Sequence, residues 1–258
     1  MTLTKRIQER LLRQLKPPPF ACRHSEYSVI ASLDDERAQP TPRLLDVVLA
    51  AADEARRIDL ADLANRLGAA SPPVNVWPGE HYRFLAGLAK VTQANRIVEI
   101  GTFRGMSALA FKRGLPEDGV ITTVDIVKWD VIQPTALTVA EFEDGRLKQI
   151  ITNLADADSF SSFAPTLEES DLIFADGPKD GFFEAMLMRQ LDKLCLRRNP
   201  LVVLDDIRQW NMLKIWRDVQ RPKMDATSLG HWTGTGVIDW NGPIVPVGGE
   251  LHRAFGSK

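Results

Sequence analysis

The sequence lacks the features that mark several broad classes of protein. It contains no run of about 18 apolar residues, the length that a membrane-spanning helix needs. Its 32 Lys and Arg are balanced by 34 Asp and Glu, so no basic excess indicates a nucleic-acid partner. Its two cysteines, Cys22 and Cys195, lie far apart and fit no metal-binding spacing. We therefore expect a cytoplasmic protein with reduced thiols, which binds neither membranes nor nucleic acid.

The first third of the chain is predicted to be helical. Residues 1–16 place apolar side chains every four positions among Lys and Arg, which predicts a basic amphipathic helix that ends at Pro17. We expect this helix to pack on the domain or on a second subunit, although a transit peptide or a membrane-surface helix would share the pattern. Residues 17–40 look irregular, and residues 41–68 predict one long helix or two short ones. Residues 1–73 should thus form a helical extension that supports a homo-oligomer.

From residue 96 onward, short apolar runs rich in β-branched residues alternate with helical segments. Such alternation is typical of an α/β fold, with a doubly wound, mostly parallel sheet, here of seven strands, within a domain spanning residues 74–258. Pro78 suits the first turn of a helix that precedes the first strand. The predicted strands are 96–100, 120–125, 147–152, 171–176 and 200–205, followed by a closing antiparallel hairpin at 225–229 and 235–240, and the predicted helices are 105–114, 182–194 and 209–219.

The first strand ends in a glycine loop, "VEIGTFRGMSA". Gly101 permits a sharp turn, Gly105 opens the next helix, and Ser107 offers a hydroxyl near its N-terminus. A nicotinamide dehydrogenase is the alternative, but its G-x-G-x-x-G fingerprint is missing and Glu99 would repel a pyrophosphate. Glu99 instead suits a cationic ligand such as the aminoacyl end of S-adenosylmethionine. Asp125, at the end of the second strand, is placed to bind ribose hydroxyls.

Three carboxylates follow two strands that can be neighbours. Asp176 ends the fourth strand, and Asp205 and Asp206 end the fifth. Together they would repel one another unless a hard divalent cation such as Mg²⁺ bound between them. The simpler interpretation is that Asp205 or Asp206 caps the following helix.

Lys179 lies three residues after Asp176, on a short loop shaped by Gly177 and Pro178. A cation lowers the pKa of a bound hydroxyl, and a lysine with a depressed pKa could take the proton. Lys179 is therefore the candidate general base. Its alternative role is an ion pair with Asp180, which we otherwise expect to steady the loop or cap the next helix.

These motifs resemble the class I S-adenosylmethionine-dependent methyltransferases, which have a Rossmann-like fold, and among them the metal-dependent catechol and caffeoyl-CoA O-methyltransferases. The resemblance covers residues 74–206 and implies S-adenosylmethionine and Mg²⁺ as cofactors and a small-molecule hydroxyl as substrate. It implies Lys179 as the catalytic base, Asp176, Asp205 and Asp206 as metal ligands, and a cofactor site made of Val76, Glu99, Gly101, Phe103, Ser107, Asp125, Ile126, Asp156 and Asp176.

One position departs from the family pattern. The family usually has Asp-Asn where this chain has Asp205-Asp206, so the site carries an extra negative charge. An Asp-Asp pair also resembles metal-dependent sugar O-methyltransferases, which leaves a catechol, a natural product or a sugar as the acceptor. A metal-independent methyltransferase of the same fold and a catalytically idle S-adenosylmethionine-binding protein remain alternatives.

Four aromatic residues are assigned less sharply. His81 lies on a predicted helix and is expected to be structural. Trp210, His231 and Trp232 should flank the pocket, as substrate contacts or as core packing.

Overall fold

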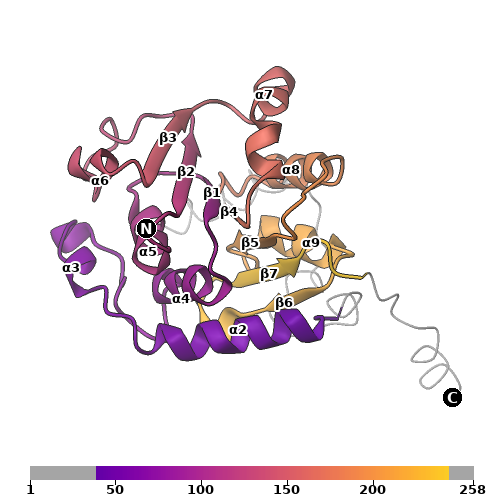
Figure 1. Cartoon of the computed structure of the whole chain (residues 1–258), viewed down its shortest axis with the longest axis horizontal. Coiled ribbons are helices and arrows are strands. Elements are labelled where there is room, and N and C mark those ends of the chain that lie inside the picture. The colour runs from indigo at the N-terminus through magenta and orange to yellow at the C-terminus, as the bar shows by residue number, and fades with distance from the viewer. Residues whose placement is uncertain (1–38, 244–258) are drawn as a thin grey trace, which may run out of the picture.

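The computed structural model describes residues 39–243, which are built around a central seven-stranded sheet (Figure 1). The predicted basic helix in residues 1–16, the irregular stretch up to residue 38 and the oligomer contact expected from them lie outside the described residues.

The sheet confirms the predicted mostly parallel α/β architecture. Its strand order is β3-β2-β1-β4-β5-β7-β6; β1 to β5 are parallel, and β7 runs antiparallel to both β5 and β6. The expected closing hairpin is therefore present, but its first strand begins earlier than predicted, and residues 227–229 form a 3₁₀ turn instead. The strands are β1 (Arg96–Ile100), β2 (Val120–Asp125), β3 (Leu147–Ile151), β4 (Leu172–Ala175), β5 (Leu201–Asp205), β6 (Lys223–Asp225) and β7 (Thr235–Asp239).

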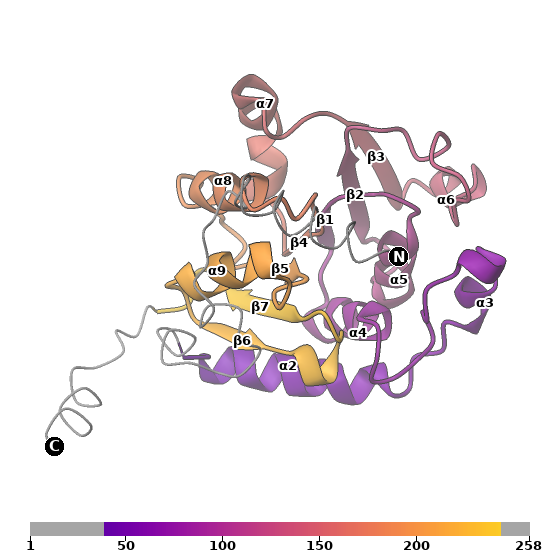
Figure 2. The ribbon, with the colours of Figure 1, turned by 180° about the vertical axis from the view of Figure 1, so that it is seen from behind.

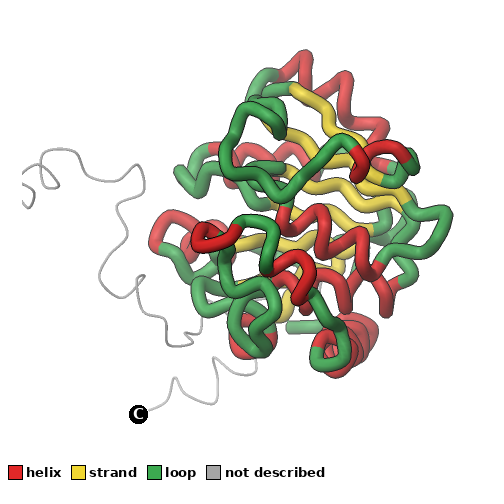
Figure 3. Tube along the Cα trace, turned by 90° about the vertical axis from the view of Figure 1, so that its left-hand side faces the viewer, coloured by secondary structure: helices red, strands yellow, loops and turns green. Residues whose placement is uncertain are grey.

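Helices cover both faces of the sheet. Side chains of α2, α4 and α5 form one apolar core with one face, and side chains of α7, α8 and α9 form a second core with the other. The view from behind shows the two groups on opposite sides (Figure 2), and a side view follows the strands among the helices (Figure 3). The helices are α2 (Pro42–Ala55), α3 (Ala61–Ala64), α4 (Tyr82–Thr92), α5 (Met106–Gly114), α6 (Ala140–Glu143), α7 (Ala157–Glu168), α8 (Phe183–Leu191) and α9 (Trp210–Asp218), with 3₁₀ turns η3 (Gly68–Ala70) and η4 (Thr227–Leu229).

The helix α2 is tied to the far edge of the sheet. Thr41 caps it by accepting a hydrogen bond from the Leu44 amide at 3.1 Å, and its hydroxyl donates to Asp239 of β7 at 2.7 Å. Arg43 pairs with the same carboxylate at 2.5 Å. The buried side chains of α2 thus belong to the same core as the sheet.

Two helix predictions need correction. The helix α4 begins at Tyr82, so Pro78 lies before it rather than in its first turn. The helix α7 was missed, although Asp156 caps it and Phe160, Phe163 and Leu167 form its buried face. That pattern is helical, and it coincides with a segment that resembles a cofactor loop.

The strand order reverses between β1 and β4. From β1 the chain moves outward to β2 and β3, then returns to place β4 and β5 on the other side of β1. In a doubly wound sheet, ligands bind beyond the carboxyl ends of the strands at this switch point. None of the helices in residues 39–243 combines the length and apolarity needed to cross a membrane.

We predict that Gly87→Ala destabilises the fold. Helix propensity alone would favour Ala by about 1 kcal/mol. However, a Cβ at Gly87 would lie 2.5 Å from the Ala51 carbonyl oxygen of α2, and this backbone cannot move aside without separating the helices. The clash should therefore outweigh the helix propensity of Ala. We expect the free energy of unfolding, measured by urea denaturation, to fall by roughly 1–3 kcal/mol. A stabilised variant would show that α2 and α4 do not pack this closely.

Candidate active site

Two adjoining cavities open at the carboxyl ends of β1, β2 and β4. Phe103 and Asp176 line both of them. The larger, of about 460 Å³, also contacts Gly101, Asp125 and Ile126. The smaller, of about 280 Å³, reaches Ser107 at the start of α5. Five predicted cofactor residues besides Asp176 thus line these cavities.

Gly101 allows the two strand ends to meet. Its φ of +105° lies in the region that favours glycine, and a Cβ there would lie 2.1 Å from the carbonyl oxygen of Asp176. The glycine loop and the Asp176 loop therefore form two walls of one cleft.

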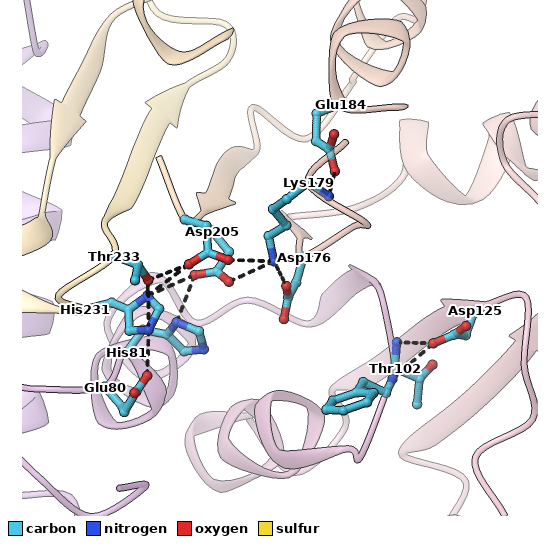
Figure 4. Close-up of polar contacts among 12 residues, drawn as sticks. Glu80, His81, Thr102, Asp125, Asp176, Lys179, Glu184, Asp205, His231 and Thr233 are labelled. Carbon is cyan, nitrogen blue, oxygen red and sulfur yellow. Dashed lines mark hydrogen bonds and ion pairs between the residues drawn. The ribbon is translucent and has the colours of Figure 1, made fainter. Parts of the chain in front are cut away.

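Asp125 shapes the glycine loop from the neighbouring strand. One of its carboxylate oxygens accepts hydrogen bonds from the amides of Thr102 and Phe103, both at 3.0 Å (Figure 4). The other oxygen accepts from the Val127 amide at 3.1 Å. Phe103 and Ile126 remain 58% and 67% exposed beside it, which is unusual for large apolar side chains and leaves them available to a flat ring.

Glu99 is a fully buried carboxyl beneath the glycine loop. Neither of its oxygens has a hydrogen-bond partner among the described residues. Burial raises the pKa of Glu99 to about 8, and the nearby hydroxyls of Ser107 and Thr123 only partly oppose the rise. A buried carboxyl of this kind is poised to accept a cationic group.

Three predicted cofactor residues, Val76, Glu99 and Asp156, do not line the cavities, and Glu99 is fully buried. Val76 is exposed and lines neither of them. Asp156 accepts a hydrogen bond from the Ser159 amide at 2.8 Å as the cap of α7, while Asn153, Leu154 and Ala155 line the larger cavity.

The three predicted metal ligands converge on the Lys179 ammonium (Figure 4). Lys179 Nζ pairs with Asp176, and it lies 3.1 Å from an oxygen of Asp205 and 3.1 Å from one of Asp206. It does not pair with Asp180, which instead caps α8 by accepting from the amides of Phe182 and Phe183. The convergence inferred from neighbouring strand ends is therefore present, with a lysine at its centre.

The charges around Lys179 oppose and outweigh the effect of burial. Burial disfavours its ammonium, but Asp176, Asp205 and Asp206 raise the pKa of Lys179 well above its usual range. Burial also opposes ionisation of Asp205, yet His81, His231 and Lys179 hold the pKa of Asp205 well below its usual range. Burial and the Asp205 carboxylate raise the pKa of Asp176.

The backbone is strained where these side chains meet. Phe103, Lys179 and Asp206 adopt φ values of +42°, +53° and +58°, which non-glycine residues rarely do. Glu184, 1% exposed, holds the Lys179 loop by accepting from the Lys179 amide at 2.8 Å. Strain of this kind persists where the surrounding structure fixes it, and it is common at functional sites.

A group of buried residues beside Asp205 was not predicted. His81, expected to be structural, places Nδ1 3.1 Å from Asp205, and His231 pairs with Glu80 at 2.6 Å and approaches Asp205 at 3.3 Å. Burial opposes protonation of His231, but Asp205 and Glu80 raise the pKa of His231 to about 10.

Sequence spacing gave little signal for this group. Glu80 and His81 precede α4, whereas His231 lies about 150 residues later, and a backbone bridge between Gly79 and His231 brings them together. The Trp232 ring stacks on His231 and is 64% exposed. The side chain of Trp210 lies outside what the structure describes.

Comparisons with known proteins show the family of this chain. The chain belongs to the O-methyltransferase family, which it matches over residues 60–229. It is 33% identical over 140 residues to the "Putative O-methyltransferase" of Mycobacterium sp. (strain JLS), covering 51% of this chain and 53% of that protein. It is 26% identical over 160 residues to the "Probable caffeoyl-CoA O-methyltransferase 3" of Dictyostelium discoideum, covering 59% of each.

The chain thus spans about half the length of the curated relatives it matches. Among solved structures, the S-adenosylhomocysteine-bound methyltransferase PaMTH1 of Podospora anserina is similar, with a TM-score of 0.49 and 18% identity, covering 94% of this chain and 98% of that one.

We predict that Glu99 makes stability fall with rising pH. The folded pKa of about 8 lies above the ordinary value of 4.5, so its stabilising contribution is complete below about pH 4.5 and is lost as the pH rises to about 8. The Gln side chain of Glu99→Gln cannot ionise. The unfolding free energy of the variant, relative to that of wild type, should therefore increase by up to about 1.4 kcal/mol for each pH unit of rise across that window. Urea denaturation at several pH values measures the difference, with the exposed Glu117→Gln as control. Parallel pH profiles for Glu99→Gln and wild type would contradict the shift.

Proposed function

We propose that this protein is an S-adenosylmethionine-dependent O-methyltransferase that methylates a hydroxyl of a small molecule, assisted by a divalent cation, with Lys179 as general base. One observation carries the proposal: the Lys179 ammonium contacts the carboxylates of Asp176, Asp205 and Asp206 beside the glycine-loop cavities. The cytoplasmic location, the homo-oligomer and the domain boundary at residue 73 stay predictions.

The cavities fit S-adenosylmethionine in three respects. The buried, unpartnered Glu99 carboxyl lies beside Ser107, which lines the smaller cavity, and it suits the cationic amino-acid end of the cofactor. Asp125 lies on the wall where ribose hydroxyls would bind. Phe103 and Ile126 offer exposed apolar surface to the adenine. Methyl transfer also needs the acceptor close and aligned with the sulfonium, and the smaller cavity adjoins the larger one at Asp176.

The three carboxylates fit a divalent cation, because one point, occupied by Lys179 Nζ, lies within contact distance of all of them. All the donors are oxygens, which suits Mg²⁺. When bound there, the cation would lower the pKa of the acceptor hydroxyl. Asp206 in place of the family's usual asparagine adds a negative charge to the site. That charge would bind the metal ion more tightly, or it would suit a different substrate, such as a sugar in place of a catechol.

Lys179 can act as base only after it gives up a proton and its carboxylate contacts. Its loop is held at the backbone by Glu184, and Asn211 donates to the Lys179 carbonyl at 3.0 Å, so the side chain can turn while the loop stays in place. The freed Nζ could then take the proton of an acceptor hydroxyl bound near Asp176. The acceptor oxygen attacks the methyl carbon as the carbon–sulfur bond breaks and its electron pair remains on sulfur.

A specific observation also favours a metal-independent enzyme. Lys179 already offsets part of the carboxylate charge without any added ion. Methyl transfer measured with Mg²⁺ and with EDTA separates the two enzymes, and turnover that EDTA leaves unchanged would exclude the metal-assisted one. Binding of S-adenosylhomocysteine with no transfer to a broad panel of hydroxyl compounds would favour a catalytically idle binding protein.

We predict that Asp125→Asn weakens S-adenosylhomocysteine binding. Loss of charge-assisted hydrogen bonds to the ribose should cost about 1.5–3 kcal/mol, or roughly 10- to 150-fold in affinity, by calorimetry. Asp156→Asn is the matched control, because asparagine also caps helices well and Asp156 lies outside both cavities. Unchanged affinity in Asp125→Asn would remove Asp125 from the cofactor site, and a loss in Asp156→Asn would restore Asp156 to it.

We predict that Lys179→Ala lowers kcat by about 10²–10⁴-fold on the acceptor that wild type methylates best in a panel of catechols and sugars. Affinity for S-adenosylhomocysteine should change little, because Lys179 lines neither cavity. Lys179→Arg should not restore the rate, since a guanidinium stays protonated. Lys193→Ala, at an exposed lysine, is the control. A Lys179→Ala enzyme with the wild-type kcat would show that Lys179 serves only as a counter-charge.

A further inference from the structure

The carboxylate of Asp205 faces two different environments through its two oxygens (Figure 4). Oδ2 lies 3.1 Å from Lys179 Nζ. Oδ1 points the other way, 3.1 Å from His81 Nδ1 and 3.3 Å from His231 Nδ1. Oδ1 of Asp206 lies 3.8 Å from the same nitrogen of His231. Two imidazoles and two carboxylates therefore converge on the side of Asp205 away from Lys179.

The polar atoms at this convergence are buried and under-used. His81 is 3% exposed, and neither of its ring nitrogens has a hydrogen-bond partner among residues 39–243. Asp205 Oδ1 is also buried and has no hydrogen-bond partner among the described residues. The approach of His81 Nδ1 to Asp205 is thus close but lacks the alignment of a hydrogen bond. Because unpaired buried polar groups are costly, a ligand bound between these atoms would relieve that cost.

The surroundings of His231 resemble those of a metal-binding histidine. Its Nε2 lies 2.6 Å from the Glu80 carboxylate, which leaves Nδ1 to face Asp205 and Asp206. The Thr233 hydroxyl lies 2.8 Å from Nδ1 and donates to Asp206, so it orders the same group. In metal-binding histidines, one ring nitrogen usually binds the metal while the second donates a hydrogen bond to a carboxylate, which fixes the orientation of the ring.

We propose that His81, His231, Asp205 and Asp206 form a binding site for a transition-metal dication such as Zn²⁺ or Co²⁺, with Glu80 orienting His231. This site goes beyond the proposed function, because two of its four ligands are imidazoles and it excludes Asp176. Imidazole nitrogen favours borderline metals, whereas Mg²⁺ prefers oxygen alone. Donors bound at about 2.1 Å in tetrahedral geometry are about 3.4 Å apart. The three separations between imidazole nitrogens and carboxylate oxygens, 3.1, 3.3 and 3.8 Å, lie on either side of that value.

The test is Co²⁺ binding to the full chain after EDTA treatment, followed by visible absorption and by competition with Zn²⁺ and Mg²⁺. Wild type should bind Co²⁺, lose it to Zn²⁺ and retain it in excess Mg²⁺. His81→Asn and His231→Asn should each lower the affinity at least about 100-fold, and Glu80→Gln about 10- to 100-fold. Asp156→Asn, at a carboxylate that caps α7 and lies outside this group, is the matched control and should bind Co²⁺ as wild type does. Histidine variants that fold normally by circular dichroism and bind Co²⁺ unchanged would overturn the proposal.

A measurement on wild type alone covers the case in which a variant does not fold. X-ray absorption of the Zn²⁺-loaded protein should show a nitrogen and oxygen shell with the outer scattering of two imidazole rings. A shell of oxygen alone, or no bound Zn²⁺, would overturn the site. Calorimetry with S-adenosylhomocysteine tests the proposed function separately, because none of these four ligands lines either cavity.

Discussion

The contact between the Lys179 ammonium and the three carboxylates of Asp176, Asp205 and Asp206 is the interaction on which the site depends. Asp205 is 3% exposed and Asp206 8%, so neither charge could be kept there without a cation. Removing one partner from a buried pair of this kind typically costs about 3–5 kcal/mol, because the remaining charge stays buried. The three carboxylates therefore require a positive charge beside them, which lysine, a metal ion or both can supply.

The sheet supplies the geometry that this interaction requires. Because β4 and β5 are parallel neighbours, Asp176 and Asp205 emerge at the same edge. The reversal of strand order beside β4 places the glycine loop of β1 next to them, and Gly101 lets the two loops approach closely. Asp176 thus belongs both to the group of charges around Lys179 and to the walls of the two cavities. Methyl transfer from a cofactor to an activated acceptor would need the two to lie this close.

The sequence was sufficient for the parts that follow from strand ends and local patterns. Apolar runs located β1 to β5, and parallel pairing then brought Asp176 and Asp205 together. It was insufficient where distant segments meet: no spacing rule joins His81 to His231, which a backbone bridge at Gly79 brings side by side. It could not fix the direction of the Lys179 pKa shift, because that direction depends on whether carboxylates or a bound metal ion dominate around the ammonium. Asp156 also caps α7, a role that the resemblance to a cofactor loop did not predict.

The most direct test of the account is anomalous diffraction from crystals grown with S-adenosylhomocysteine and Mn²⁺, an ion that accepts both oxygen and nitrogen ligands. The account predicts S-adenosylhomocysteine in the cavities between Phe103 and Asp125, and at least one Mn²⁺ peak within about 2.5 Å of an Asp205 oxygen. If the ion takes the Lys179 side of Asp205, Nζ should be displaced from it. The account would be contradicted by crystals that contain S-adenosylhomocysteine but show no anomalous peak at Asp205, with Lys179 still in place among the three carboxylates.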